Sequence, residues 1–320
     1  AEDGIRDYKV TGVQTCALPI LRTFILRRLL QTVPLLLGIS ALTFLLLQLA
    51  PGDYLSTMAM DPQVSPAALE AMRHRFGLDQ PWWVQYLLYL RNVCLHLDFG
   101  ESFSRHQPVF AVLRTGLGNT LLLATTAALV TWGLAIPLGM LAAVRHNRGA
   151  DRALGLVAFI GLAVPEVLSG LLLLWLASRT GWFPVGGLHA IDFEDFTPLQ
   201  RLLDLLRHLA LPALVVGLVP LASRMRQMRG SLIDQLRLDY VTTARAKGLP
   251  ESQVVVRHAL RNALNPLITL FGFTLGSLVS GAFVAETIFS WPGLGSITLE
   301  ALNAQDTYLV MGSVLMASTV

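Results

Sequence analysis

Residues 115–144 have the sequence TGLGNTLLLATTAALVTWGLAIPLGMLAAV, which contains no charged side chain. A helix needs about 20 mostly apolar residues to cross the ~30 Å hydrocarbon core of a bilayer, so this stretch predicts a membrane span. Five other stretches are similarly apolar, although 153–178 contains Glu166 and 209–223 is shorter with a helical pattern that can continue at both ends. Together the six stretches predict an all-α, polytopic bundle of six transmembrane helices. The five others are residues 29–49, 153–178, 209–223, 262–285 and 307–320, the last cut off by the end of the sequence.

The overall composition supports a membrane protein. Of the 320 residues, 53% are hydrophobic and only 14% are charged, whereas a soluble domain carries about 25% charged residues. The net charge of +3 is concentrated in particular loops, so it does not indicate nucleic-acid binding. Cys16 and Cys94 lie in unrelated segments and predict neither a disulfide framework nor a metal site.

Basic residues alternate between the connections, which predicts the orientation. Arginines precede the first span, and further arginines fill residues 145–152 and 224–261, while residues 179–207 and 286–306 have no basic excess. Cytoplasmic loops carry an excess of Lys and Arg. We therefore expect a multi-pass membrane protein with a cytoplasmic N-terminus. Trp182 and Trp291 fall just outside predicted spans and are either interfacial aromatics or loop-packing residues.

Four regions follow from this pattern. Residues 1–20 lack periodicity, a signal-peptide layout and an initial Met, and they resemble translated adapter read-through, so they are set apart from the fold. Residues 21–49 form the cytoplasmic N-terminus and first span, residues 50–114 an external subdomain, and residues 115–320 the main transmembrane domain. In the external part, Ser65 and Pro66 predict a helix start. This part is either a platform for an external partner or a cap over helix ends.

Motifs for catalysis or nucleotide binding are not found. The sequence lacks the Gly-rich phosphate loop that ends in Gly-Lys-Ser/Thr, and beyond residue 20 its one lysine is Lys247. The seven histidines show no zinc-type spacing. The sequence therefore predicts no enzyme, no cofactor and no metal site.

The polar stretch 239–250, DYVTTARAKGLP, lies between two predicted spans. Residues 240–247 predict a short helix with small residues on one side, and Gly248-Leu249-Pro250 predicts its end. A helical pattern resumes at 249–261, and Asn265-Pro266 begins the next span. So ordered a loop indicates a docking site, whereas the alternative is an ordinary basic loop.

An ordered set of stretches resembles the permease subunits of ABC importers for dipeptides, oligopeptides and nickel, and the similarity runs from about residue 21 to residue 320. The stretches are 49–53 (LAPGD), 76–86 (FGLDQPWWVQY), 98–102 (DFGES), 118–120 (GNT), 239–249 (DYVTTARAKGL) and 286–295 (ETIFSWPGLG).

This resemblance implies that the loop at 229–265 holds an EAA-type coupling helix, which sits in a groove of an ATPase subunit. Ala244 and Gly248 match the Ala and Gly of that motif. Thr242 and Thr243 stand where Glu and Ala occur in the wider superfamily, so a glutamate contact is not carried over. The residues expected to contact the ATPase are Tyr240, Ala244, Arg245, Ala246, Lys247, Gly248 and Leu249.

The resemblance also implies a location in the bacterial inner membrane and a particular assembly. The chain would supply half of a pathway in the lipid bilayer, together with a second homologous permease subunit, two ABC ATPase subunits and an external solute-binding protein. Selectivity would rest largely on the binding protein, so the choice among peptides, glutathione, nickel or sugars stays open.

Glu166 is an acid in the middle of the predicted span 153–178. A charged side chain at this depth costs roughly 2.5–3.5 kcal/mol on insertion scales, so Glu166 should face protein or water. One hypothesis is that Glu166 and Ser169 line the translocation pathway, where Glu166 meets a cationic group of the substrate. The alternative is an interhelical hydrogen bond that satisfies the acid.

Three other classes of protein would show different sequence features. A gradient-driven secondary transporter predicts two related halves and paired intramembrane charges, but no inverted repeat is evident. An intramembrane enzyme needs a catalytic constellation, which Glu166 and Ser169 alone do not provide. A scaffold protein would not need the ordered stretch at 239–250.

Overall fold

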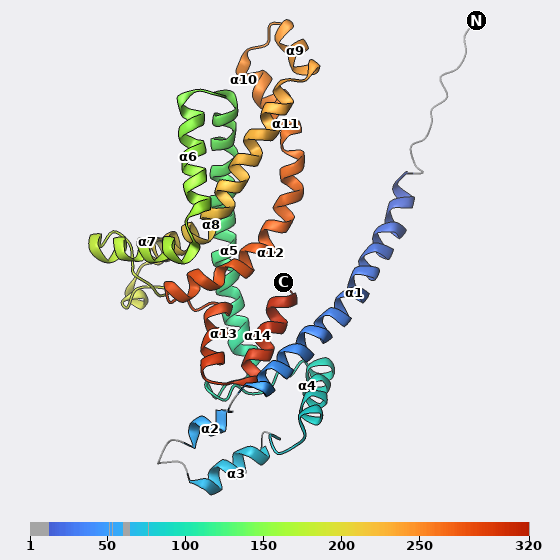
Figure 1. The fold of residues 1–320 in the computed structure, drawn as a ribbon, viewed down its shortest axis with the longest axis vertical. Coiled ribbons are helices and arrows are strands. Elements are labelled where there is room, and N and C mark those ends of the chain that lie inside the picture. The colour runs from blue at the N-terminus through green and yellow to red at the C-terminus, as the bar shows by residue number, and fades with distance from the viewer. Residues whose placement is uncertain (1–12, 51, 53, 60–64, 76, 320) are drawn as a thin grey trace, which may run out of the picture. The chain divides into compact units, whose positions relative to one another are not determined.

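The computed structural model describes residues 13–50, 52, 54–59, 65–75 and 77–319. Over these residues the chain is helical, without a β-strand, as the all-α prediction requires (Figure 1). It divides into two compact units, one made of Ala1–Leu97 and Val314–Thr319 and the other of Asp98–Ser313. Of the predicted segment 1–20, residues 1–12 lie outside the described residues, and the others belong to the first helix.

The first unit contains α1 (Val13–Leu49), α2 (Tyr54–Met58), α3 (Pro66–Arg75) and α4 (Trp82–His96). The predicted start of α3 is confirmed, because the Ala68 amide donates a 3.2 Å hydrogen bond to Ser65 Oγ. Tyr86 of α4 and Ser40 of α1 share a hydrogen bond of 2.9 Å between their hydroxyl groups. This polar contact therefore links the apolar helix α1 to α4.

The second unit holds the remaining helices. They are α5 (Val109–Val144), α6 (Gly149–Ala163), α7 (Glu166–Thr180), α8 (Pro198–Leu236), α9 (Asp239–Ala246), α10 (Glu251–Gln253), α11 (Leu260–Ala263), α12 (Asn265–Ile288), α13 (Leu294–Asn303) and α14 (Thr307–Thr319, through Ser313). A 3₁₀ turn (Phe193–Asp195) precedes α8, and a π-helix (Val254–Ala259) joins α10 to α11.

Apolar helices occupy all six predicted spans. Among the described residues, Leu26–Ser56, Val109–Val144 and Pro198–Leu236 are each long and apolar enough to cross a membrane. Two further candidates are bent pairs, α6 with α7 and the two parts of α12, and counting each pair as one span gives up to five. The sixth segment, α14, is shorter, with 13 residues.

The predicted span at 153–178 is divided between two helices, α6 and α7. The chain bends by 103° between α6 and α7, at Val164 and Pro165. A residue before proline is pushed away from helical geometry, and Val164 has the extended angles φ −81° and ψ 122°. Figure 1 shows α7 projecting sideways from the end of α6.

The directions of the central helices follow from their contacts. Thr131 of α5 donates a 3.2 Å hydrogen bond to the Gly217 carbonyl of α8, and Gly139 of α5 lies against Met228. Residue numbers rise together in both helices, so α5 and α8 are parallel. Trp132 packs edge-on against Phe271 of α12, with ring centroids 5.4 Å apart, while Thr120 contacts Glu286. Helix α12 is therefore antiparallel to α5, which is the alternation that six consecutive spans require.

Candidate functional site

Helix α9 is the short helix that the polar stretch predicts. It covers Asp239–Ala246, one residue earlier than expected, and the chain turns at Gly248 with φ +79°. The Gly248 amide donates to the Arg245 carbonyl at 2.9 Å. Glycine adopts this left-handed conformation without the penalty that a Cβ imposes, so it ends a helix readily.

One face of α9 is buried against the long helices. Val241 and Ala244 belong to a core cluster that also contains Met228 and Leu232 of α8 and Val254 of the π-helix. Ala244, predicted to contact the ATPase, is thus only 6% exposed and faces the inside. A small side chain at this position allows α9 to lie close to its support.

The opposite face of α9 is open. Arg245, Ala246, Lys247 and Gly248 are exposed, whereas Leu249 is half-buried. Tyr240 is also half-buried, and its hydroxyl donates a 2.8 Å hydrogen bond to Gln235 Oε1. The predicted residues therefore separate into an outward edge and an inward anchor.

Arg245 bridges the turn after α9. Its guanidinium donates to Glu251 through Nη2 at 2.7 Å and through Nε at 3.1 Å. This hydrogen bond from Arg245 lowers the pKa of Glu251, against a smaller opposing effect of burial. The pair joins the ends of α9 and α10 and leaves Lys247 as the cation at the tip of the turn.

The segment 239–263, here called the coupling segment, is fastened to a long helix at its other end as well. Ser231 of α8 donates a 2.8 Å hydrogen bond to the Ala263 carbonyl of α11. Figure 1 shows α9, α10 and α11 together at one end of the second unit, with α13 at the opposite end. Both ends of the coupling segment therefore contact α8.

A bidentate ion pair also stabilises the region where α6 meets α8. Arg229 of α8 donates to Asp151 of α6 through Nε at 2.5 Å and through Nη2 at 2.8 Å. Asp151 is buried, and it also accepts a 2.9 Å hydrogen bond from the Asn147 amide. The start of α6 is thereby fixed to the same helix that carries α9.

Glu166 lies at the corner between α6 and α7, not within a straight span. Its Oε1 atom is buried, and no hydrogen-bond partner for it is found among the described residues. Ser169 is 8% exposed, and its hydroxyl donates to the Glu166 carbonyl at 2.8 Å. The two residues are therefore adjacent, and the interhelical hydrogen bond weighed as the alternative is not seen in the described part of the chain.

The buried acid Glu286, which the sequence did not single out, lies near the C-terminal end of α12. Glu286 has no exposed surface. Its Oε1 accepts a hydrogen bond from Thr120 at 2.5 Å, and its Oε2 accepts from the amides of Gly295 at 2.7 Å and Ser296 at 3.2 Å. The distribution of basic residues predicts an external connection for residues 286–306, which include Glu286. The sequence signal that could have revealed it was the Pro-Gly-Leu-Gly turn that follows this acid within a few residues.

Trp291 belongs to the same contact. It is fully buried, and its Nε1 donates to the Asn119 carbonyl at 3.1 Å, while Trp182 is 75% exposed. Trp291 is therefore a loop-packing residue, not an interfacial one. The stretches 118–120 and 286–295, which are distant in sequence, contact each other directly.

A second buried acid fastens the stretch 98–102. Asp306 is fully buried and accepts hydrogen bonds from the hydroxyls of Ser102 at 2.6 Å and Ser104 at 3.0 Å. The ring of Tyr308 lies against Gly100, where a Cβ would come within 3.3 Å of it. This turn before α5 is thus fixed to the start of α14.

The chain is similar in sequence to known families of membrane proteins. Residues 135–320 match the family described as "Binding-protein-dependent transport system inner membrane component", and residues 20–124 match the N-terminal family of the same membrane components. The chain belongs to this family. It is the membrane permease of an ABC transport system and not an enzyme, since the ATPase is a separate subunit.

Several relatives of this permease match along nearly their whole length. The oligopeptide transport system permease protein AppB of Bacillus subtilis is 38% identical over 297 residues, covering 92% of each chain. The di/tripeptide permease DppB of Pseudomonas aeruginosa is 38% identical over 311 residues, covering 93% of this chain and 92% of the relative. The dipeptide permease DppB of Escherichia coli K12 is 37% identical over 313 residues, covering 92% of each. The permease is thus a multi-pass membrane protein with the expected all-α fold.

Proposed function

We propose that this permease forms half of a transmembrane pathway for peptides. We also propose that an ATPase subunit docks on the outward edge of α9 and displaces it during transport. The names of its relatives, which are oligopeptide and dipeptide permeases, support the substrate class. A second homologous permease completes the pathway, two ATPase subunits dock at the coupling segment, and an external binding protein delivers the peptide. The N-terminus lies in the cytoplasm.

The observation that carries this proposal is the division of α9 into two faces. Val241 and Ala244 anchor it to α8, while Arg245, Ala246 and Lys247 stay exposed. An isolated helix of this length is marginal in water, so its order depends on the buried face. A helix held in this way transmits force as a rigid body.

Charge also favours a docking role for the outer edge. Glu251 occupies one side of Arg245, so Lys247 is the cation that remains at the tip. Attraction to lipid headgroups alone does not require an ordered helix, an ion pair and a glycine turn. A protein surface with a shaped groove does require them.

Glu166 is proposed to line the pathway. A buried carboxylate oxygen without a partner in the described chain lies where the broken helices α6 and α7 meet. Broken helices in transporters are tolerated where they line a cavity. The amino terminus of a peptide is a cation that matches this acid.

Cross-linking tests the docking proposal. Ala246→Cys, in a variant whose native cysteines are serine, should form a cross-link to the ATPase subunit when the assembled transporter is treated with a short bifunctional reagent. The matched control is Asn303→Cys, exposed on α13 at the opposite end of the unit, which should give no such cross-link. A cross-link from residue 303 but not from residue 246 would contradict the proposal.

A further inference from the structure

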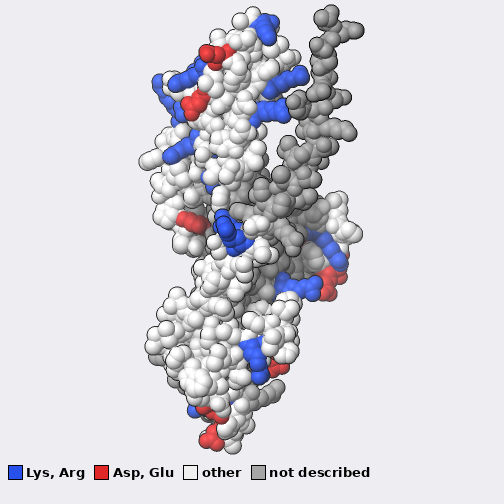
Figure 2. All heavy atoms as spheres, turned by 90° about the vertical axis from the view of Figure 1, so that its right-hand side faces the viewer, with Lys and Arg blue, Asp and Glu red and all other residues white. Residues whose placement is uncertain are grey.

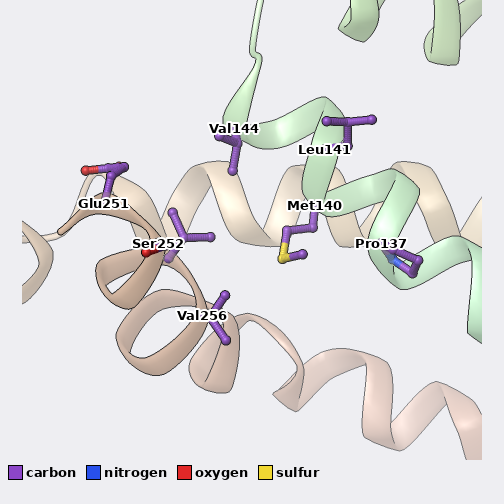
Figure 3. A pocket seen from close by; sticks show the side chains of 8 residues that line it. Pro137, Met140, Leu141, Val144, Glu251, Ser252 and Val256 are labelled. Carbon is purple, nitrogen blue, oxygen red and sulfur yellow. The ribbon is translucent and has the colours of Figure 1, made fainter.

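A groove lies at the coupling segment. One wall is formed by the last two turns of α5, and the other by α10 and the π-helix. Its volume is ≈ 440 Å³, within the range of about 300–1,000 Å³ that small-molecule sites occupy. Figure 3 shows its side chains facing one another from the two elements. The apolar walls are formed by Pro137, Met140, Leu141 and Val144 on α5 and by Val255 and Val256 on the π-helix.

The groove changes character along its length. In Figure 3, Glu251 and Ser252 lie at one end and Pro137 lies at the other. Glu251 is engaged by Arg245, so the polar end does not present a bare negative charge. The groove therefore runs from a polar loop to the apolar body of α5.

Two arginines directly follow residues that line the groove. Arg145 directly follows Val144, Arg257 directly follows Val256, and both arginines are exposed. Figure 2 shows that Lys and Arg outnumber Asp and Glu on the visible face of the end that carries α9 to α11. A ligand that fits has an anionic head and a long apolar tail.

We propose that this groove binds an anionic phospholipid, with one acyl chain between α5 and the π-helix and the phosphate beside Arg145 and Arg257. Basic residues next to a membrane span attract anionic headgroups. The wall of the groove is a π-helix, a rare geometry that recurs at functional sites. The exposed arginines beside the groove favour a lipid with an anionic phosphate over an apolar packed helix as the occupant.

A photoactivatable lipid tests the proposal. The full chain is placed in phosphatidylcholine nanodiscs with a small fraction of phosphatidylglycerol that carries a diazirine in its acyl chain, and the labelled peptides are mapped. Labels should fall on residues 137–144 and 252–256. Val256→Trp and Leu141→Trp each fill the groove, and each should lower this labelling by about tenfold, since several buried CH₂ groups lose their site.

The controls separate the possible outcomes. Val157→Trp changes an exposed valine on α6, outside the groove, and should leave the labelling unchanged. Two filling variants are used so that misfolding of one, seen as loss of a monodisperse elution peak, does not remove the test. Undiminished labelling in a folded filling variant would overturn the proposal.

The headgroup is tested with the same probe. A phosphatidylcholine analogue with an identical diazirine chain should label the groove less than the phosphatidylglycerol probe does. The double variant Arg145→Gln, Arg257→Gln should remove that preference while the chain still labels Val256. Equal labelling of the wild-type groove by both probes would overturn the anionic assignment, and a cross-link to a second protein chain would assign the groove to a packed helix instead.

Discussion

The hydroxyl of Thr120 in α5 donates a 2.5 Å hydrogen bond to Oε1 of Glu286, in the last turn of α12. Thr120 Oγ1 in turn accepts a 2.7 Å hydrogen bond from the Leu294 amide at the start of α13. One threonine therefore joins three helices at the end of the bundle opposite the coupling segment. Movement of α12 relative to α5 must either preserve this contact or break it.

Loss of the Glu286 carboxylate should destabilise the permease. In Glu286→Leu the Thr120 hydroxyl and the amides of Gly295 and Ser296 lose their acceptor, and each buried donor left unsatisfied costs about 1–3 kcal/mol. We expect a clearly lower midpoint of thermal unfolding for the purified protein. Glu300→Leu is the control, because Glu300 is 64% exposed in its ion pair with Arg105 and should change the midpoint little. Equal midpoints for the two variants would show that the buried network does not hold this end together.

The turn after α9 should require glycine. Gly248 has φ +79°, and a Cβ added there would meet open space, so Gly248→Ala introduces backbone strain of about 1–2 kcal/mol without a steric clash. We expect reduced peptide uptake with ATP hydrolysis retained, measured in proteoliposomes. Gly230→Ala, within α8 and also in open space, should not reduce uptake. A Gly248→Ala variant with unchanged transport would argue against a role for this turn.

The Arg245–Glu251 pair should stabilise the permease at neutral pH and lose this effect in acid. Because Arg245 holds the pKa of Glu251 below its unfolded value, which is about 4.3, the contribution is complete above that value and is lost as the pH falls through the lower folded pKa. Both side chains are substantially exposed, so we expect at most about 1 kcal/mol. Unfolding midpoints of the wild type and Glu251→Gln should differ slightly at pH 7 and converge below pH ~4. A gap that widens on acidification would contradict this assignment.

Glu166 should distinguish substrates by charge. In Glu166→Gln we expect slower uptake of peptides with a free amino terminus than in the wild type, and little change for amino-terminally acetylated peptides. Competition transport assays with the two peptide forms measure this ratio. Glu300→Gln is the control, since Glu300 is an exposed acid in an ion pair with Arg105. An unchanged ratio in Glu166→Gln would remove Glu166 from the pathway.

Much of the fold could be predicted because its signals are local. The length of an apolar stretch is enough to predict a span, and Gly248 and Pro250 mark the end of α9 through their own backbone preferences. Ser65 likewise predicts the start of α3. These features depend on neighbouring residues alone.

The parts that could not be predicted depend on tertiary contacts. A proline within a span is compatible with either a slight kink or a full break, and the 103° bend at Pro165 is set by what α6 and α7 pack against. The burial of Glu286 and Trp291 depends on Thr120 and Asn119, more than 160 residues earlier in the chain. Ala244 matches the coupling motif, but only the packing against Met228 and Leu232 shows that it faces inward.

A measurement of the energy source for transport tests the central claim most directly. The assembled transporter, with its ATPase subunits and binding protein, is reconstituted in proteoliposomes, and uptake of a radiolabelled dipeptide is measured with ATP, without ATP, and with ionophores that abolish ion gradients. This account predicts uptake that requires ATP and is unaffected by the ionophores. Uptake that proceeds without ATP and is abolished by the ionophores would contradict it and assign the chain to gradient-driven transport.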